Sequence, residues 1–138
     1  MASSGWSSAR ASYAVLVVVT MAVGLMVHEH GTALSPVVRD VLGDALWAAM
    51  VVWGFGVIAP AMPRLWRGAA AVAVAFSVEF SQLLHFQAID ALRRTTIGSL
   101  VLGSGFDPRD FAAYTAGALV AVLIDMAVTR RWTDRFQP

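Results

Sequence analysis

The hydrophobic residues of this chain fall into four long stretches, separated by short segments that contain prolines, arginines and carboxylates. The stretches lie near residues 11–28, 42–62, 68–87 and 109–129. Each is close to the ~20 residues that an α-helix needs to cross a hydrocarbon core about 30 Å thick. The pattern therefore predicts an all-α integral membrane bundle of four transmembrane helices.

The segments between the stretches predict where the helices begin and end. Two prolines close the second stretch, and Arg64 and Arg67 follow, which is typical of a tight turn between two spans. Before the fourth stretch, Asp107 can cap a helix whose first position Pro108 occupies. The apolar piece "TTIGSLVLG" at 95–103 is too short to span. It is compatible with a surface position or with a short re-entrant helix that protein covers.

Composition narrows the classes of function. Hydrophobic residues make up 58% of the 138 residues and charged residues 14%, which is too apolar for a soluble domain of this size. We expect residues 1–138 to form a single transmembrane domain. The absence of cysteine excludes disulfides, thiolate metal sites and cysteine nucleophiles. A formal net charge of +1 excludes the broad basic surface of a nucleic-acid-binding protein, so we expect no nucleic acid partner.

The arginines predict the orientation in the membrane. Four spans place both termini and the turn near 62–68 on one side, with six arginines, against four arginines on the other side. The positive-inside rule then predicts a multi-pass protein of the bacterial inner membrane with cytoplasmic N- and C-termini. In an alternative interpretation, residues 1–33 are a cleaved signal peptide ending in "GTA", which leaves three spans.

A glutamate lies deep in the third stretch. Glu79 falls about 18 Å along the helix from Arg67, just past the middle of the bilayer. Gln82 and His85 follow at three-residue spacing, so the outer half of this helix has a polar face. A charge at such depth costs about 2.5–3.5 kcal/mol unless it faces protein or water. We therefore expect Glu79 to point into the bundle.

The other helices carry matching polar positions. Asp110, Tyr114 and Gly117 are spaced i, i+4 and i+7 and lie on one face of the fourth helix. Asp44 lies at the same level on the second helix. Arg93, in the segment before the fourth helix, is expected to be the counterion of these carboxylates, because its planar guanidinium suits carboxylate and phosphate groups.

Each of these residues also has a purely structural interpretation. Glu79 and Gln82 are compatible with a role in joining helices by hydrogen bonds. Asp44 and Asp110 are compatible with charges that complement helix dipoles, and Tyr114 with an interfacial aromatic residue.

Other polar residues give weaker signals. The "HEH" at 28–30 contains competent metal ligands, but their adjacent spacing favours an interfacial loop, and we expect no metal and no cofactor. Asp125 is expected to be solvated or paired at the inner boundary, close to Arg130 and Arg131.

Several motifs together carry a family resemblance. They are "GDALWA" at 43–48, "EFSQ" at 79–82, the arginine at 93, "LGSGF" at 102–106 and "DFAAYTAG" at 110–117. Across about residues 13–128 the chain resembles a family of small four-helix bacterial membrane proteins of unknown function (DUF2809). A ribosome-maturation label that such proteins sometimes carry has no support in these residues.

The chain is also similar, more distantly, to the VanZ-like membrane proteins associated with glycopeptide resistance and the cell envelope. The resemblance rests on a Glu-x-x-Gln pair, a later arginine, and an aspartate seven residues before a glycine. Tyr114 replaces the asparagine of that family's last motif. The matching positions here are Glu79, Gln82, Arg93, Asp110 and Gly117. What the resemblance implies is a shared polar cluster.

Three functions are compatible with these observations. In the first, an uncharacterised cell-envelope protein binds a lipid head group or cell-wall precursor in an outer-leaflet polar pocket. The alternatives are a structural or assembly subunit whose polar cluster only specifies helix packing, and a membrane-embedded enzyme whose carboxylates act on a lipid-linked substrate. Expected partners are membrane lipids and a second copy or another membrane protein. The candidate ligand-binding residues are Asp44, Glu79, Gln82, Arg93, Asp110 and Tyr114, and no catalytic residue is identified.

Overall fold

The structure, a computed structural model, describes residues 2–103 and 105–135, and this part of the chain is helical without strands. The predicted all-α class is therefore confirmed. The helices are α1 (Ala2–His30), α2 (Pro36–Ile58), α3 (Arg64–Ser81), α4 (Gln87–Arg93), α5 (Thr96–Leu102) and α6 (Asp110–Arg135), with a short 3-10 turn η1 (Gly31–Ala33) after α1.

Three helices in the described part are long and apolar enough to cross a membrane. The segments are Ser8–Ala33, Pro36–Ile58 and Asp110–Ala127. They correspond to the first, second and fourth predicted spans. The third predicted span corresponds to α3. This helix has 18 residues and contains Arg64, Arg67 and Glu79, so its composition alone does not identify it as a span.

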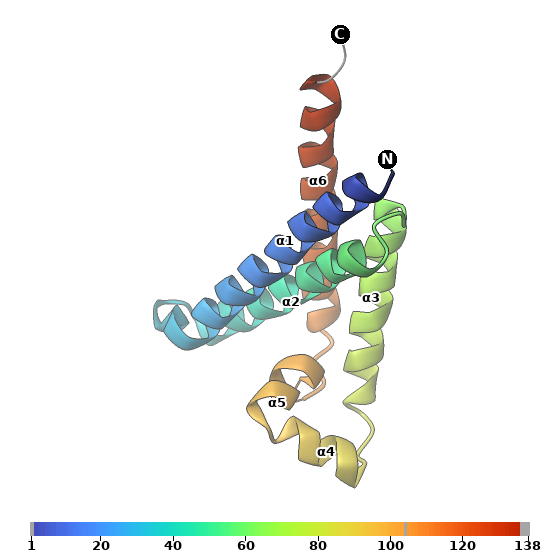
Figure 1. Ribbon diagram of the computed structural model, residues 1–138. Coiled ribbons are helices and arrows are strands. Elements are labelled where there is room, and N and C mark those ends of the chain that lie inside the picture. The colour runs from blue at the N-terminus through green and yellow to red at the C-terminus, as the bar shows by residue number, and fades with distance from the viewer. Residues whose placement is uncertain (1, 104, 136–138) are drawn as a thin grey trace.

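The helices share two ends. In Figure 1 the beginning of α1, the α2–α3 turn and the C-terminal end of α6 lie towards one end of the molecule, which we call the termini end. The short helices α4 and α5 lie at the opposite end, the far end, where they connect α3 to α6. The hairpin of α1 and α2 crosses α6 at an angle, and its upper right end in the view reaches the beginning of α3.

Small residues form much of the core where α2, α3 and α6 meet. Fully buried positions include Ala48, Ala71, Ala75 and Ala121. Alanine and glycine allow helix backbones to approach closely, as is common between membrane helices. Helices α2 and α6 approach closely at Gly117 of α6, where a Cβ atom would collide with the backbone carbonyl of Ala45 in α2.

The short apolar piece near 95–103 forms a capped helix. Thr95 caps α5, because its hydroxyl accepts the Gly98 N–H at 3.0 Å. Gly103 ends α5 with φ +71°, a backbone conformation that favours glycine. Ile97 and Val101 are exposed, so α5 presents an apolar surface to its surroundings.

Candidate functional site

A buried carboxylate organises the far end of the bundle. The Glu79 side chain, in the last turn of α3, is 0% exposed. Its Oε2 accepts hydrogen bonds from Gln82 Nε2 at 2.8 Å and from the Tyr114 hydroxyl at 3.2 Å. Its Oε1 accepts the backbone N–H of Asp107 at 2.7 Å. A buried carboxylate is tolerated only when its oxygens are hydrogen-bonded, and these three donors meet that need. They also fasten α3 to α6 and to the loop before it.

Two further carboxyl groups approach Glu79. Asp44 of α2 and Asp110 of α6 are within hydrogen-bonding reach of each other, and both interact electrostatically with Glu79. Both are half-buried, so they lie nearer the surface than Glu79. No three His, Asp or Glu side chains of the described residues are arranged as metal ligands. Asp44, Glu79 and Asp110 therefore lie near one another without being arranged as ligands of a metal ion.

Arg93 does not join these carboxylates. Its NH2 donates to the Ser81 carbonyl at 2.8 Å and to the Ser81 hydroxyl at 3.1 Å. Its NH1 donates to the Leu84 carbonyl at 3.2 Å and to Asp90 at 3.3 Å. The expected role of Arg93 as their counterion is therefore wrong. The last carbonyls of a helix lack partners and attract a cation, and α4 places Arg93 next to the end of α3.

The same contacts explain why α3 ends early. The third apolar stretch predicts a helix to residue 87, whereas α3 ends at Ser81 and turns at Gln82. Arg93 takes up carbonyls that a longer helix would bond internally. Hydrophobicity alone does not predict that α3 ends at Ser81, because the next residues include Leu83 and Leu84, which are as apolar as residues inside the helix.

The loop before α6 contributes a contact that the sequence reading missed. The motif at 102–106 predicts a turn and no contact with the site, yet Gly103 packs against the Gln82 amide, where a Cβ atom would collide with it. Helix α6 begins at Asp110 and not at Pro108. Asp107 accepts hydrogen bonds from the side chain and backbone of Arg109, which lower the pKa of Asp107. This turn aims the Asp107 N–H at Glu79.

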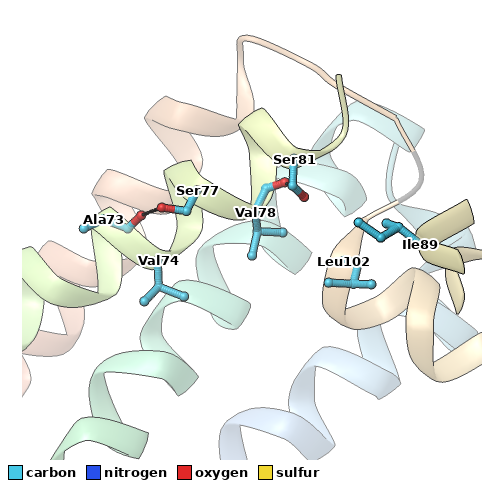
Figure 2. A pocket seen from close by; sticks show the side chains of 7 residues that line it. All are labelled: Ala73, Val74, Ser77, Val78, Ser81, Ile89 and Leu102. Carbon is cyan, nitrogen blue, oxygen red and sulfur yellow. Dashed lines mark hydrogen bonds between the residues drawn. The ribbon is translucent and has the colours of Figure 1, made fainter. Parts of the chain in front are cut away.

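An apolar groove lies beside the buried group of Glu79, Gln82 and Tyr114, which we call the Glu79 cluster. It has a volume of about 480 Å³ and runs between one face of α3 and the short helices α4 and α5. Figure 2 shows α3 side chains on one wall and Ile89 and Leu102 on the other. Ser77 and Ser81 line it too, but their hydroxyls donate to carbonyls of their own helix at 2.7 Å and 2.6 Å. The lining residues are Ala73, Val74, Ser77, Val78, Ser81, Ile89 and Leu102.

A second polar cluster lies at the termini end, and the sequence reading missed it. Asp125 of α6, 7% exposed, pairs with Arg67 NH2 at 2.8 Å, and the Arg67 side chain is also buried. The Tyr13 hydroxyl of α1 donates to the Asp125 carboxylate at 3.0 Å, and the Arg67 guanidinium lies 4.7 Å from the Tyr13 ring centroid. Arg64 Nε is 3.5 Å from Asp125.

The partners of Asp125 correct one expectation. Asp125 is paired, as one of the two expectations had it, but it is buried, and its described partners are Arg64 and Arg67 of α3. The side chains of Arg130 and Arg131, the expected neighbours, lie outside the part of the chain whose side chains are described. The only available signal was that Arg67 and Asp125 lie at the same end of two neighbouring spans.

Comparison with known proteins assigns the chain to a family. The family described as "Protein of unknown function (DUF2809)" matches residues 33–118, a span that includes the whole far-end cluster from Asp44 to Tyr114. No solved structure matches the chain. The more distant VanZ-like similarity stays a prediction. The chain belongs to the DUF2809 family, whose function is unknown.

Proposed function

We propose that this protein is a four-span membrane protein of the cell envelope that binds a lipid in the groove at its far end. The observation that carries the proposal is the aliphatic groove between α3 and α4–α5, whose lining residue Ser81 accepts a hydrogen bond from Arg93. A groove lined this way suits a fatty acyl chain better than a soluble metabolite, because it offers almost no hydrogen bonds.

Helix α3 is the proposed fourth span. Its 18 residues extend about 27 Å, close to the thickness of the hydrocarbon core. Its charges Arg67 and Glu79, one in each end turn, are buried against protein, whereas its exposed side chains include Val74 and Phe80. This distribution is what a span beside α6 requires. By the arginine distribution, the termini end is cytoplasmic and the far end lies in the outer leaflet.

The polar end of the groove supplies the head-group contact. The Ser81 hydroxyl, on the groove wall, accepts a hydrogen bond from Arg93, so the guanidinium lies directly behind that wall. Arg93 Nε is buried and has no hydrogen-bond acceptor among the described residues. An anionic head group at this end would be attracted to the guanidinium, and arginine is well suited to phosphate. We propose a lipid with a phosphate-containing head group.

The Glu79 cluster has a different role in this proposal. Glu79, Gln82 and Tyr114 are buried and bonded to one another, which supports a positioning role more than direct ligand contact. They hold α3, one wall of the groove, against α6. This observation also favours the second candidate, a structural subunit without a bound lipid.

Filling the groove should remove the lipid. We expect Val78→Phe to lower lipid retention strongly, because the larger ring occupies the space of the acyl chain. Arg93→Gln should lower the affinity about tenfold, the loss expected for one charge-assisted hydrogen bond. Native mass spectrometry of the full chain, extracted from membranes in mild detergent, counts the retained phospholipids.

Matched controls separate this result from general damage. Val120→Phe adds the same ring to an exposed position of α6, and Arg94→Gln removes the neighbouring, exposed arginine. Both should retain lipid as the parent protein does. If Val78→Phe retains lipid equally well while remaining folded, the groove does not bind lipid and the structural role is favoured.

A further inference from the structure

Helices α4 and α5 form a short hairpin, the α4–α5 hairpin, that exposes apolar side chains at the far end of the molecule. No residue of α4, which the structure describes throughout, is buried. Leu92 is 55% exposed, Ile97 is 77% exposed, and Val101 is also exposed. The loop that leads from α3 into α4 adds the exposed side chains of Leu84 and Phe86. A single exposed apolar residue is ordinary, whereas their concentration in one short segment indicates a surface that contacts a membrane or another protein.

The apolar and polar side chains of α5 lie on different faces. Ile97 and Val101 are spaced i and i+4, so they share one face of the helix. Thr96 and Ser99 lie towards the opposite face at 100° per residue. Leu102 lines the groove beside α3. The hairpin therefore packs one side against the bundle and presents a separate, apolar side to its surroundings.

The turn between α4 and α5 satisfies its polar groups internally. The Thr95 hydroxyl donates to the Leu92 carbonyl at 2.7 Å and accepts the Gly98 N–H at 3.0 Å. Gly98 lies so close to Leu92 that a Cβ atom would collide with the Leu92 carbonyl. The Ser99 hydroxyl donates to the Thr96 carbonyl at 2.9 Å. Unbonded backbone groups are costly where water is scarce, so a turn that is bonded in this way is compatible with apolar surroundings.

The helices on either side of the hairpin determine its level in the membrane. In the four-span arrangement, the 18 residues of α3 extend about 27 Å, so its last residue, Ser81, reaches the boundary of the hydrocarbon core. Helix α6 begins at Asp110, at the same end of the molecule (Figure 1). The α4–α5 hairpin is therefore held at one surface of the membrane, and Figure 1 shows α4 turned away from the axis of α3 there.

We propose that the α4–α5 hairpin is an interfacial anchor, whose exposed apolar face lies among the upper acyl chains of the leaflet at the far end. Arg94, exposed two residues after Leu92, lies at the level of the lipid phosphates, because an arginine keeps its aliphatic stem among acyl chains while its guanidinium reaches the head groups. Short helices with one apolar face lie in the plane of the interface in this way. Lipid is favoured over a protein partner, because the flanking helices already place the hairpin beside acyl chains. The inference rests on α3 as the fourth span and not on lipid in the groove.

Site-directed spin labelling tests the position of the hairpin, because the chain has no cysteine and each single-cysteine variant carries one label. The full chain is reconstituted in vesicles of phosphatidylethanolamine and phosphatidylglycerol. Collisions of the label with oxygen, which partitions into acyl chains, are compared with collisions with a water-soluble nickel chelate. We expect labels at Leu92→Cys and Ile97→Cys to favour oxygen, as at the exposed control Val120→Cys of α6. A label at Thr96→Cys, on the polar face, should favour nickel, as at the exposed control Arg109→Cys.

Three results overturn the proposal. A label at Ile97 that favours nickel as strongly as the Arg109 control places the hairpin in water. Labels at Leu92 and Ile97 that neither reagent reaches place a protein, such as a second copy of the chain, over this face. Labels at both Ile97 and Thr96 that favour oxygen place α5 inside the membrane as a re-entrant helix.

Two further variants separate failure of the anchor from failure of the proposed function. Val78→Phe, which fills the groove, should leave the values at Leu92 and Ile97 unchanged even when it removes the bound lipid. A label at Val74→Cys, exposed on α3, should favour oxygen. A preference for nickel at Val74 would contradict α3 as a span, and the anchor with it, whatever the lipid retention of the groove variants.

Discussion

Replacing Asp125 with alanine is expected to lower the free energy of unfolding by about 3–5 kcal/mol. The carboxylate is the hydrogen-bonded partner of Arg67, which is 2% exposed, and without it that guanidinium stays buried with no counter-charge. The Tyr13 hydroxyl loses its acceptor at the same time, which loosens α1 from α6. Denaturant unfolding of the full chain in detergent micelles, followed by circular dichroism, measures the change.

A double substitution distinguishes the lost pairing from lost packing. Combining Asp125→Leu with Arg67→Met removes both charges and keeps much of the side-chain volume. Because a buried ion pair often contributes little relative to apolar packing, this variant should be close to the parent in stability. An Asp125→Ala variant as stable as the parent would mean that water or lipid head groups already solvate Arg67.

The second large effect is expected at the crossing of α2 and α6. Gly117→Ala should lower the free energy of unfolding by about 1–3 kcal/mol, because the added Cβ collides with the Ala45 carbonyl and the helices must separate. The shift would also displace Asp44 and Tyr114, which lie within one turn of the contact. The same unfolding assay measures the cost.

Gly54→Ala is the matched control for that substitution. Gly54 lies in α2, and an added Cβ would meet nothing within 4 Å. Alanine is the better helix former, so this variant should be as stable as the parent or slightly more stable. If Gly117→Ala is as stable as Gly54→Ala, α2 and α6 are not packed as closely at Gly117 as the structure shows.

Local spacing predicted much of the far-end arrangement. Hydrophobic runs of span length indicated the three long apolar helices, and helical periodicity placed Asp110, Tyr114 and Gly117 on one face. The structure brings Tyr114, Gln82 and Glu79 together and presses Gly117 against α2. The ligand-binding role of these residues stays a prediction, because their contacts are with one another.

Contacts that depend on loop geometry could not be predicted in this way. Whether Arg93 meets the carboxylates or the end of α3 depends on how residues 82–95 turn, and no periodic pattern encodes that turn. The contact between Tyr13 and Asp125 joins residues 112 positions apart, so it emerges only when α1 and α6 are packed. The Asp107 N–H is a backbone donor, which side-chain patterns cannot reveal.

The buried Glu79 carboxylate fastens α3 to α6 through its hydrogen bond from Tyr114. A double-mutant cycle of Glu79→Met and Tyr114→Phe, measured by unfolding in micelles, tests it most directly, with Glu79→Met and Tyr13→Phe as a control cycle. We predict a coupling of at least about 1 kcal/mol for the first cycle and additive effects for the control. Additivity within about 0.5 kcal/mol in the first cycle would contradict the claim.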